Sequence, residues 1–147
     1  MSKKFNSKKA QAVLRDLEEN HQHSIYDEVY LRNKKCLNRM ALFYRGNYIS
    51  YRELFEKVEN FADSLYTLGY RKGDEIPVCM KMSPEFIYMF LAISKIGAVI
   101  NAVGEWFNSE YLESILRNTG SKYIFITSNV FEKIKQSIGD SGIKYVV

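Results

Sequence analysis

The sequence predicts an α/β protein with a parallel-type sheet and crossover helices. Two observations carry this prediction. Beyond residue 74, short apolar runs that favour strands alternate with stretches of helical period. Gly69, Gly97 and Gly120 follow helical stretches, in the place where a glycine commonly ends a helix. Strands and helices in strict alternation are typical of right-handed crossovers on one parallel sheet.

The first 40 residues are predicted to be a helical segment that precedes a partial α/β subdomain at 41–147. A first amphipathic helix is expected from about Ser7 to His21, because apolar residues recur there at helical spacing. A second, shorter helix is expected from Ser24 to about Asn33, with Ile25, Val29 and Tyr30 facing inward. The two segments together are expected to form a single globular unit.

A β-hairpin and a long helix are predicted next. Two β-favouring runs, 41–44 and 48–49, flank the turn Arg45-Gly46-Asn47. Ser50 and Glu53 form a capping box that starts a helix, and Gly69 stops it. The inward stripe of this helix comprises Leu54, Val58, Phe61, Ala62, Leu65 and Leu68.

The longest apolar stretch, Ser83 to Val103, is predicted to be a buried helix that feeds a buried strand. Ser83 can cap the helix, Pro84 suits its first position, and Gly97 ends it. A helix that is apolar nearly all round must be covered on several sides. The preceding run, Glu75 to Met80, is predicted to be a strand, although Pro77 belongs near a strand's start or at a sheet edge.

The rest of the chain repeats the alternation of helix and strand. A helix from about Asn108 to Asn118 is expected to carry Tyr111, Leu112, Ile115 and Leu116 on one face. The strand Tyr123–Thr127, a helix from Val130 to Ser137 and a strand that begins at Lys144 complete the pattern. A chain that stops inside a strand is expected to be an incomplete piece of a larger domain with an exposed sheet edge.

Composition narrows the class of protein. The 147 residues include 46% hydrophobic and 26% charged residues, which is typical of a soluble globular protein. The net charge of +4 brings anionic partners into consideration. Basic residues gather near the start and at 32–39 but alternate with acids later, which favours solvated surface over a nucleic-acid or membrane site. No transmembrane segment, disulfide or secretory signal is predicted, so we expect a cytoplasmic protein.

No catalytic, cofactor-binding or metal-binding residue is predicted in this chain. Neither common glycine-rich phosphate loop is present, and the hydrolase and metalloenzyme signatures are missing. His21 and His23 lack a surrounding framework of ligands. Asp74, Glu85, Glu105 and Glu110 stand at turns and helix starts, where solvation and the helix dipole explain carboxylates.

Trp106 and Phe107 are the best physical candidates for a substrate pocket. They follow the predicted strand that ends near Val103, and ligands bind at the carboxyl ends of strands in open α/β sheets. The competing interpretation is that both aromatic rings close the core beneath a connection.

An ordered set of segments resembles the AMP-forming acyl-CoA synthetases and related adenylating enzymes. The run 49–54 resembles the family's L-[TS]-Y-x-E-L motif, and 68–74 resembles LGV-x-x-GD. The runs 83–86 and 95–99 are similar to the SPE and KAGAV segments, and 123–127 to the following strand. The matching residues that we expect to have structural roles are Ser50, Tyr51, Glu53, Leu54, Gly73, Asp74, Ser83, Pro84, Glu85, Gly97 and Ala98. Ala102 and Glu105 stand where the family usually has prolines.

The resemblance implies a ligase that joins a carboxylic acid to ATP as an acyl-adenylate, then transfers the acyl group to coenzyme A or a carrier thiol. ATP, Mg²⁺ and coenzyme A are the cofactors expected for the full-length parent, with fatty acid metabolism as its setting. The family's nucleotide-binding loop and catalytic lysine lie downstream, so this chain is expected to bind none of them and not to be catalytic by itself. Its expected partners are the remainder of its own protein and a second copy at the sheet edge.

Three alternatives remain open at this point. The chain could be a stand-alone, degenerate synthetase-like interaction module without enzymatic activity. It could be a fragment of a peptide synthetase adenylation domain. A basic nucleic-acid-binding domain is the third, and for it we expect no binding at physiological salt.

Overall fold

The computed structural model describes residues 23–104, 109–139 and 141–147. The predicted helix at 7–21 lies outside these ranges. The helices are α2 (Ile25–Asn33), α3 (Tyr51–Thr67), α4 (Pro84–Lys95), α5 (Ser109–Thr119) and α6 (Ser128–Gly139). The strands are β1 (Met40–Tyr44), β2 (Asn47–Ser50), β3 (Glu75–Cys79), β4 (Val99–Ala102), β5 (Tyr123–Ile126) and β6 (Tyr145–Val146).

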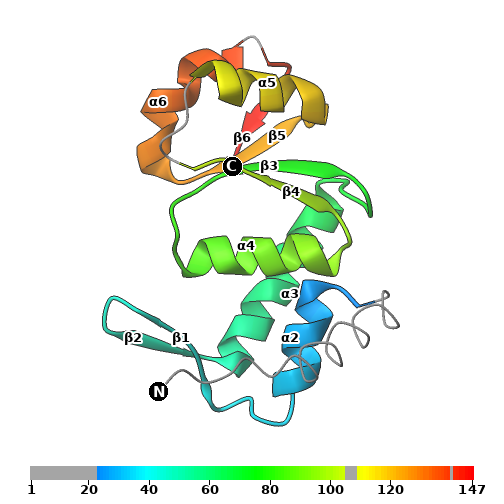
Figure 1. Cartoon of the computed structure of the whole chain (residues 1–147), viewed down its shortest axis with the longest axis vertical. Helices are drawn as coiled ribbons and strands as arrows, with labels where there is room; N and C mark the ends of the chain where they lie inside the picture. Colours follow the sequence, from blue (N-terminus) through cyan, green and yellow to red (C-terminus); the bar gives the residue numbers. More distant parts are fainter. Residues whose placement is uncertain (1–22, 105–108, 140) are drawn as a thin grey trace, which may run out of the picture.

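The predicted α/β class is confirmed. Four parallel strands form a sheet in the order β4-β3-β5-β6, and β1 pairs with β2 as a separate antiparallel hairpin. Helix α4 covers one face of the sheet with α3 beyond it, whereas α5 and α6 cover the other face (Figure 1). Helix α2 packs against α4. Among the described residues, no helix is long and apolar enough to cross a bilayer.

Strand β3 lies inside the sheet although it contains Pro77. Val103 donates its N–H to the carbonyl of Val78 at 2.8 Å, so the backbone of Val78 faces β4 and that of Pro77 faces β5. Pairing with β5 begins only at Val78. The pairing of the sheet therefore requires no N–H at position 77. This explains how an interior strand accommodates proline, a residue that is usually found at sheet edges.

The sheet separates two hydrophobic cores. Ile76 and Val78, both fully buried, point into the larger core with the apolar sides of α3 and α4. Cys79 belongs to the smaller core, which also contains Leu112, Leu116, Ile124, Val130 and Ile134. Side chains alternate between the two faces of a strand, so β3 contributes to both cores.

Three side chains that were predicted to face inward are exposed. Ile25 is 54% exposed, Tyr111 is 60% exposed and Tyr30 is 39% exposed. On α2 the buried side chain is instead Tyr26, whose ring packs edge-on against Phe55 at 6.1 Å. Val29, also predicted to face inward, is half-buried against the larger core, so the inward face of α2 is formed by Tyr26 and Val29.

Helix α4 begins and ends as predicted. Ser83 accepts a hydrogen bond from the N–H of Phe86, and Pro84 occupies the first turn. At the other end the N–H of Gly97 bonds to the carbonyl of Ser94, and the N–H of Ala98 bonds to that of Ile93, which is a Schellman motif. Gly97 adopts φ +72°, a left-handed conformation that favours glycine.

Replacing Gly97 with alanine is expected to lower the free energy of unfolding by about 1 to 2 kcal/mol, because an L-residue is strained in the left-handed region. An added Cβ would also lie 3.0 Å from Cγ of Lys72. Urea denaturation followed by circular dichroism measures the change. The matched control is Gly139→Ala, at a glycine where an added Cβ meets nothing within 4 Å. Equal effects of the two substitutions would contradict the prediction.

A network of polar contacts links α2 to α3 and α4. The hydroxyl of Tyr26 donates to Oε1 of Glu59 at 2.6 Å, and Lys95 pairs with the same carboxylate. The ammonium of Lys95 also lies 4.8 Å from the centre of the Tyr26 ring. Burial by itself would raise the pKa of Glu59, but the hydrogen bonds from Lys95 and Tyr26 outweigh it and lower that pKa.

The lowered pKa predicts a contribution to stability that depends on pH. The folded pKa of Glu59 lies below its ordinary value of 4.5. The network therefore stabilises the fold fully above that value and loses the contribution as the pH falls through the folded pKa. We expect Glu59→Gln to flatten the loss of thermal stability between neutral and acidic pH. Glu56→Gln removes an exposed carboxylate from the same helix and should leave the profile unchanged; identical profiles for wild type and Glu59→Gln would contradict the assignment.

Candidate functional site

The candidate site lies at the carboxyl ends of the parallel strands. The connection from β3 to β4 runs to one side of β3, and the connection from β4 to β5 crosses to the other side. Neighbouring strands whose connections leave in opposite directions open a crevice at their carboxyl ends, where ligands of open α/β sheets bind. In this fold that crevice lies at the loops that follow β3, β4 and β5.

Backbone bonds hold the three loops together. The N–H of Thr127, just after β5, points to the carbonyl of Cys79 at 3.4 Å. The N–H of Lys81 donates to Oγ1 of the same threonine at 3.3 Å. Val103 bonds to Val78 as described above, so the segments after all three strands are fixed relative to one another.

A cavity of 360 Å³ opens between the ends of β3 and β4. It is lined by Met80, Lys81, Met82, Phe86, Ala102, Val103 and Gly104. Most of this surface is apolar, and it includes two flexible thioether side chains that adapt to irregular shapes. Among the described lining residues, Lys81 is the one that is ionisable. A lining of this kind can hold an apolar group with a negative charge at one end.

The described residues that line the cavity are suited to binding. None of these described residues has a carboxylate, histidine or hydroxyl side chain that could act as a base or a nucleophile. Nowhere in the described ranges do three or more histidine, cysteine, aspartate or glutamate residues gather in a way that could hold a metal ion. His23, the described member of the histidine pair, is exposed and lies 3.4 Å from Glu28.

Trp106 and Phe107, the predicted pocket residues, lie outside the described residues, as does Glu105. Gly104, the last described residue before them, lines the cavity. Their role in a pocket therefore stays a prediction. Met80, Lys81 and Met82 were missed, although the rule that selected Trp106 applies equally to the end of the predicted strand at 75–80.

Most residues that carry the family resemblance lie at the ends of elements, and of the matched runs only 83–86 reaches the described lining of the cavity, through Phe86. Ser50 and Glu53 form the capping box of α3, in which the N–H of Ser50 donates to Glu53 at 2.8 Å. Tyr51 is half-buried and Leu54 is buried on the first turns of the same helix. They start α3 and pack its first turns against the larger core.

Two segments of the resemblance meet at the opposite, amino edge of the sheet. Gly73 donates its N–H to the carbonyl of Gly97 at 2.9 Å. Val99 donates to the carbonyl of Asp74 at 2.8 Å, which begins the pairing of β3 with β4 just after Ala98. Of the remaining matched residues, Ser83 and Pro84 start α4, with Glu85 exposed in its first turn. The motifs therefore set the register of the sheet and the position of α4.

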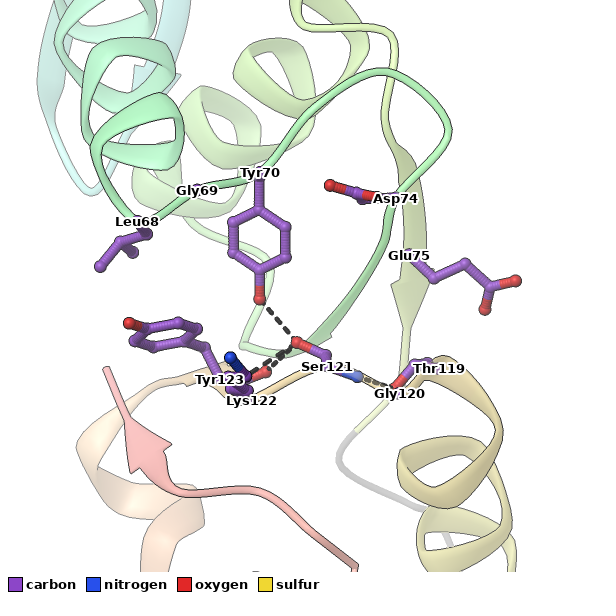
Figure 2. A pocket seen from close by; sticks show the side chains of 10 residues that line it. All are labelled: Leu68, Gly69, Tyr70, Asp74, Glu75, Thr119, Gly120, Ser121, Lys122 and Tyr123. Carbon is purple, nitrogen blue, oxygen red and sulfur yellow. Dashed lines mark hydrogen bonds between the residues drawn. The ribbon is translucent and has the colours of Figure 1, made fainter.

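A second, more polar cavity of 320 Å³ lies at this amino edge, between the loops that lead into β3 and β5. Figure 2 shows the Tyr70 hydroxyl pointing to Ser121, and the two oxygens are 2.6 Å apart. Burial raises the pKa of Tyr70. The carboxylate of Asp74 accepts the N–H of Arg71 at 2.7 Å. Since these groups already have partners and lie at the edge away from the carboxyl ends, we place the candidate site at the other cavity.

The chain belongs to the AMP-binding enzyme family, whose sequence model matches residues 30–146. It is 38% identical over 100 residues to acetyl-coenzyme A synthetase 1 of Saccharomyces cerevisiae, a match that covers 63% of this chain and 14% of the yeast protein. It is 34% identical over 90 residues to 4-coumarate–CoA ligase 3 of Arabidopsis thaliana, covering 61% of this chain and 16% of the ligase.

Solved structures show the same fold. A benzoate CoA ligase from Burkholderia xenovorans superimposes with a TM-score of 0.77 at 17% identity, over 85% of this chain and 26% of that one. The chain thus spans about a quarter of that structure, and 14% and 16% of the two curated relatives. The predicted family and the predicted α/β fold are confirmed. Because the chain covers only part of each relative, the activity of a whole enzyme is treated below as a proposal.

Proposed function

We propose that this chain forms the opening α/β unit of an AMP-forming acid–thiol ligase. Such a ligase activates a carboxylic acid with ATP as an acyl-adenylate and then transfers the acyl group to coenzyme A or a carrier thiol. The match to the family over residues 30–146 is the observation that carries this proposal. The names of the relatives agree with it, since each is a ligase or synthetase that acts with coenzyme A.

The cavity at the carboxyl ends of the strands suggests what this unit contributes. Its apolar lining would hold an apolar portion of the substrate, and Lys81 would face a negative charge at the mouth. ATP, Mg²⁺ and coenzyme A belong to the proposed family-length enzyme. The described residues offer no carboxylate cluster that fits Mg²⁺, so we assign no step through the metal to them.

The purified 147-residue chain is expected to release no pyrophosphate from ATP and Mg²⁺ in the presence of acetate, benzoate or 4-coumarate. The physical reason is that none of the described residues that line the cavity carries a group for acyl activation. A coupled pyrophosphate assay measures this, with the yeast acetyl-coenzyme A synthetase as the positive control. Acyl-adenylate formation by this chain above the rate without enzyme would overturn the proposal that this unit does not catalyse acyl activation by itself.

A chimaera tests the proposal in the positive direction. Residues 30–146 replace the matching segment of the yeast synthetase, and the product is assayed for acetyl-adenylate. We expect measurable activity, and we expect Ala102→Trp, which places a large side chain at an exposed lining position of the cavity, to reduce it. Leu31→Ala, on the outer side of α2, is the matched control. A folded chimaera without activity, or one that Ala102→Trp leaves unchanged, would count against the proposed role of the cavity.

A further inference from the structure

A group of basic side chains lines a hollow that the proposed function does not use. The hollow measures 380 Å³ and lies between the loop that joins α2 to β1 and the first turn of α3. Four cations line it, namely Lys34, Lys35, Arg39 and Arg52. We call it the cationic hollow. The loop from α2 to β1, which provides most of its lining, lies at the end of the molecule opposite α5 and α6 (Figure 1).

The backbone around the cationic hollow is fixed. Within the loop, the N–H of Cys36 bonds to the carbonyl of Asn33 at 2.8 Å, and the N–H of Arg39 bonds to that of Cys36 at 2.9 Å. The first turn of α3 is tied to the loop, because Arg52 donates its N–H to the carbonyl of Leu37 at 3.0 Å. The backbone that carries the cationic side chains is therefore ordered before any ligand binds, which lowers the entropy cost of binding.

The described residues around the hollow do not compensate its charge. None of the described residues that line it is acidic. Elsewhere basic side chains pair with acids, as in Arg32 with Glu28 and Arg117 with Glu113. Within the described part of the chain, Lys34, Lys35 and Arg39 form no ion pair, and Arg52 reaches only the neutral Oδ1 of Asn38 at 3.3 Å. Four like charges around one hollow repel one another, and an anion would relieve that repulsion.

The ends of helices explain only part of this arrangement. Lys34 and Lys35 follow the carboxyl end of α2, where the helix dipole favours cations. Arg39 lies beyond that turn, and Arg52 lies in the first turn of α3, where the dipole disfavours a cation. The convergence of all four on one hollow therefore requires a reason besides helix capping.

We propose that the cationic hollow binds a phosphoryl group. The volume of 380 Å³ is within the usual range for a small-molecule site. Arginine guanidinium groups present paired donors that match phosphate oxygens, and lysine ammonium groups add point charge. Soluble phosphate compounds and lipid headgroups both present this chemistry to the four side chains, and the two probes below distinguish them.

Titration of the full chain with two probes tests this site. Inorganic pyrophosphate is followed by NMR of the backbone amides at 34–39, and vesicles that contain a phosphatidylinositol phosphate are followed by co-sedimentation. We expect saturable binding to at least one probe, weakened by salt, since screening reduces attraction between exposed charges. The triple variant K34Q/K35Q/R39Q is expected to bind about tenfold more weakly, a change of the size that the loss of about three exposed charge contacts produces.

A second triple variant provides the control for charge. K72Q/K122Q/K144Q removes the same net charge from exposed lysines that do not line the hollow, and it should bind within about twofold of wild type. Binding of pyrophosphate alone would identify a soluble ligand, and binding of vesicles alone a lipid headgroup; either supports the site. No saturable binding to either probe, equal losses in the two triple variants, or tighter binding to single-stranded RNA than to pyrophosphate would overturn it. Circular dichroism confirms that both variants fold.

Discussion

Replacing Ile93 with alanine is expected to lower the free energy of unfolding by about 3 kcal/mol, within the range for large-to-small changes in a core. Ile93 is 1% exposed on α4 and belongs to the larger of the two cores. It lies where α4 is covered by α3 on one side and by the sheet on the other, so the surroundings have little freedom to close the cavity that the substitution leaves.

Urea denaturation of the wild type and the variant measures this change in stability. The matched control is Leu31→Ala on α2, where the side chain is 41% exposed and a change within about 0.5 kcal/mol is expected. A loss of less than about 1 kcal/mol in Ile93→Ala would mean that the core refills the space, contrary to a rigid packing of α4.

The burial of α4 could be predicted because its signals are local. Ser83 and Pro84 mark its start, Gly97 marks its end, and the residues between them leave almost no polar face. Such signals depend on neighbouring residues alone. The same holds for the capping box of Ser50 and Glu53, which the structure confirms.

The inward faces of α2 and α5 were harder to predict. Tyr26 is buried because Phe55 packs against its ring and Glu59, 33 residues away, accepts its hydroxyl hydrogen. No pattern within α2 reveals either partner. Tyr111 borders the apolar positions of α5, yet only Leu112 and Leu116 become fully buried. Helical spacing defines a face to within about one residue, and packing decides which border residue is covered.

The sequence predicts at which edge of the sheet the candidate site lies, but not all of the residues that line it. The rule about carboxyl ends of strands selected residues after β4, and Gly104 and Val103 do line the cavity there. The contribution of Met80 and Phe86 depends on β3 lying beside β4, with α4 folded back over that pair. Strand order is a tertiary property, so the chain's local pattern could not supply it.

Replacing Ser121 with alanine is expected to lower the free energy of unfolding by about 2 kcal/mol, because it leaves a buried donor without a partner. The Ser121 hydroxyl donates its hydrogen to the carbonyl of Tyr123 at 2.8 Å, so Tyr70 is the donor in the 2.6 Å bond between the two hydroxyls. Burial raises the pKa of Tyr70, which keeps that donor protonated at neutral pH. Tyr70 is 7% exposed.

A double-mutant cycle distinguishes this bond from a simple loss of packing. Tyr70→Phe should cost about 1 kcal/mol, since the N–H of Tyr123 still points to the Ser121 oxygen at 3.2 Å. The double variant should cost clearly less than the sum, because no unpaired hydroxyl remains. Additive effects, or a cost below about 0.5 kcal/mol for Ser121→Ala, would mean that water in the adjoining cavity replaces the lost partner. The bond spans 51 residues and joins the loop after α3 to the start of β5. A strong coupling would therefore show that this contact holds together the two loops at the amino edge of the sheet.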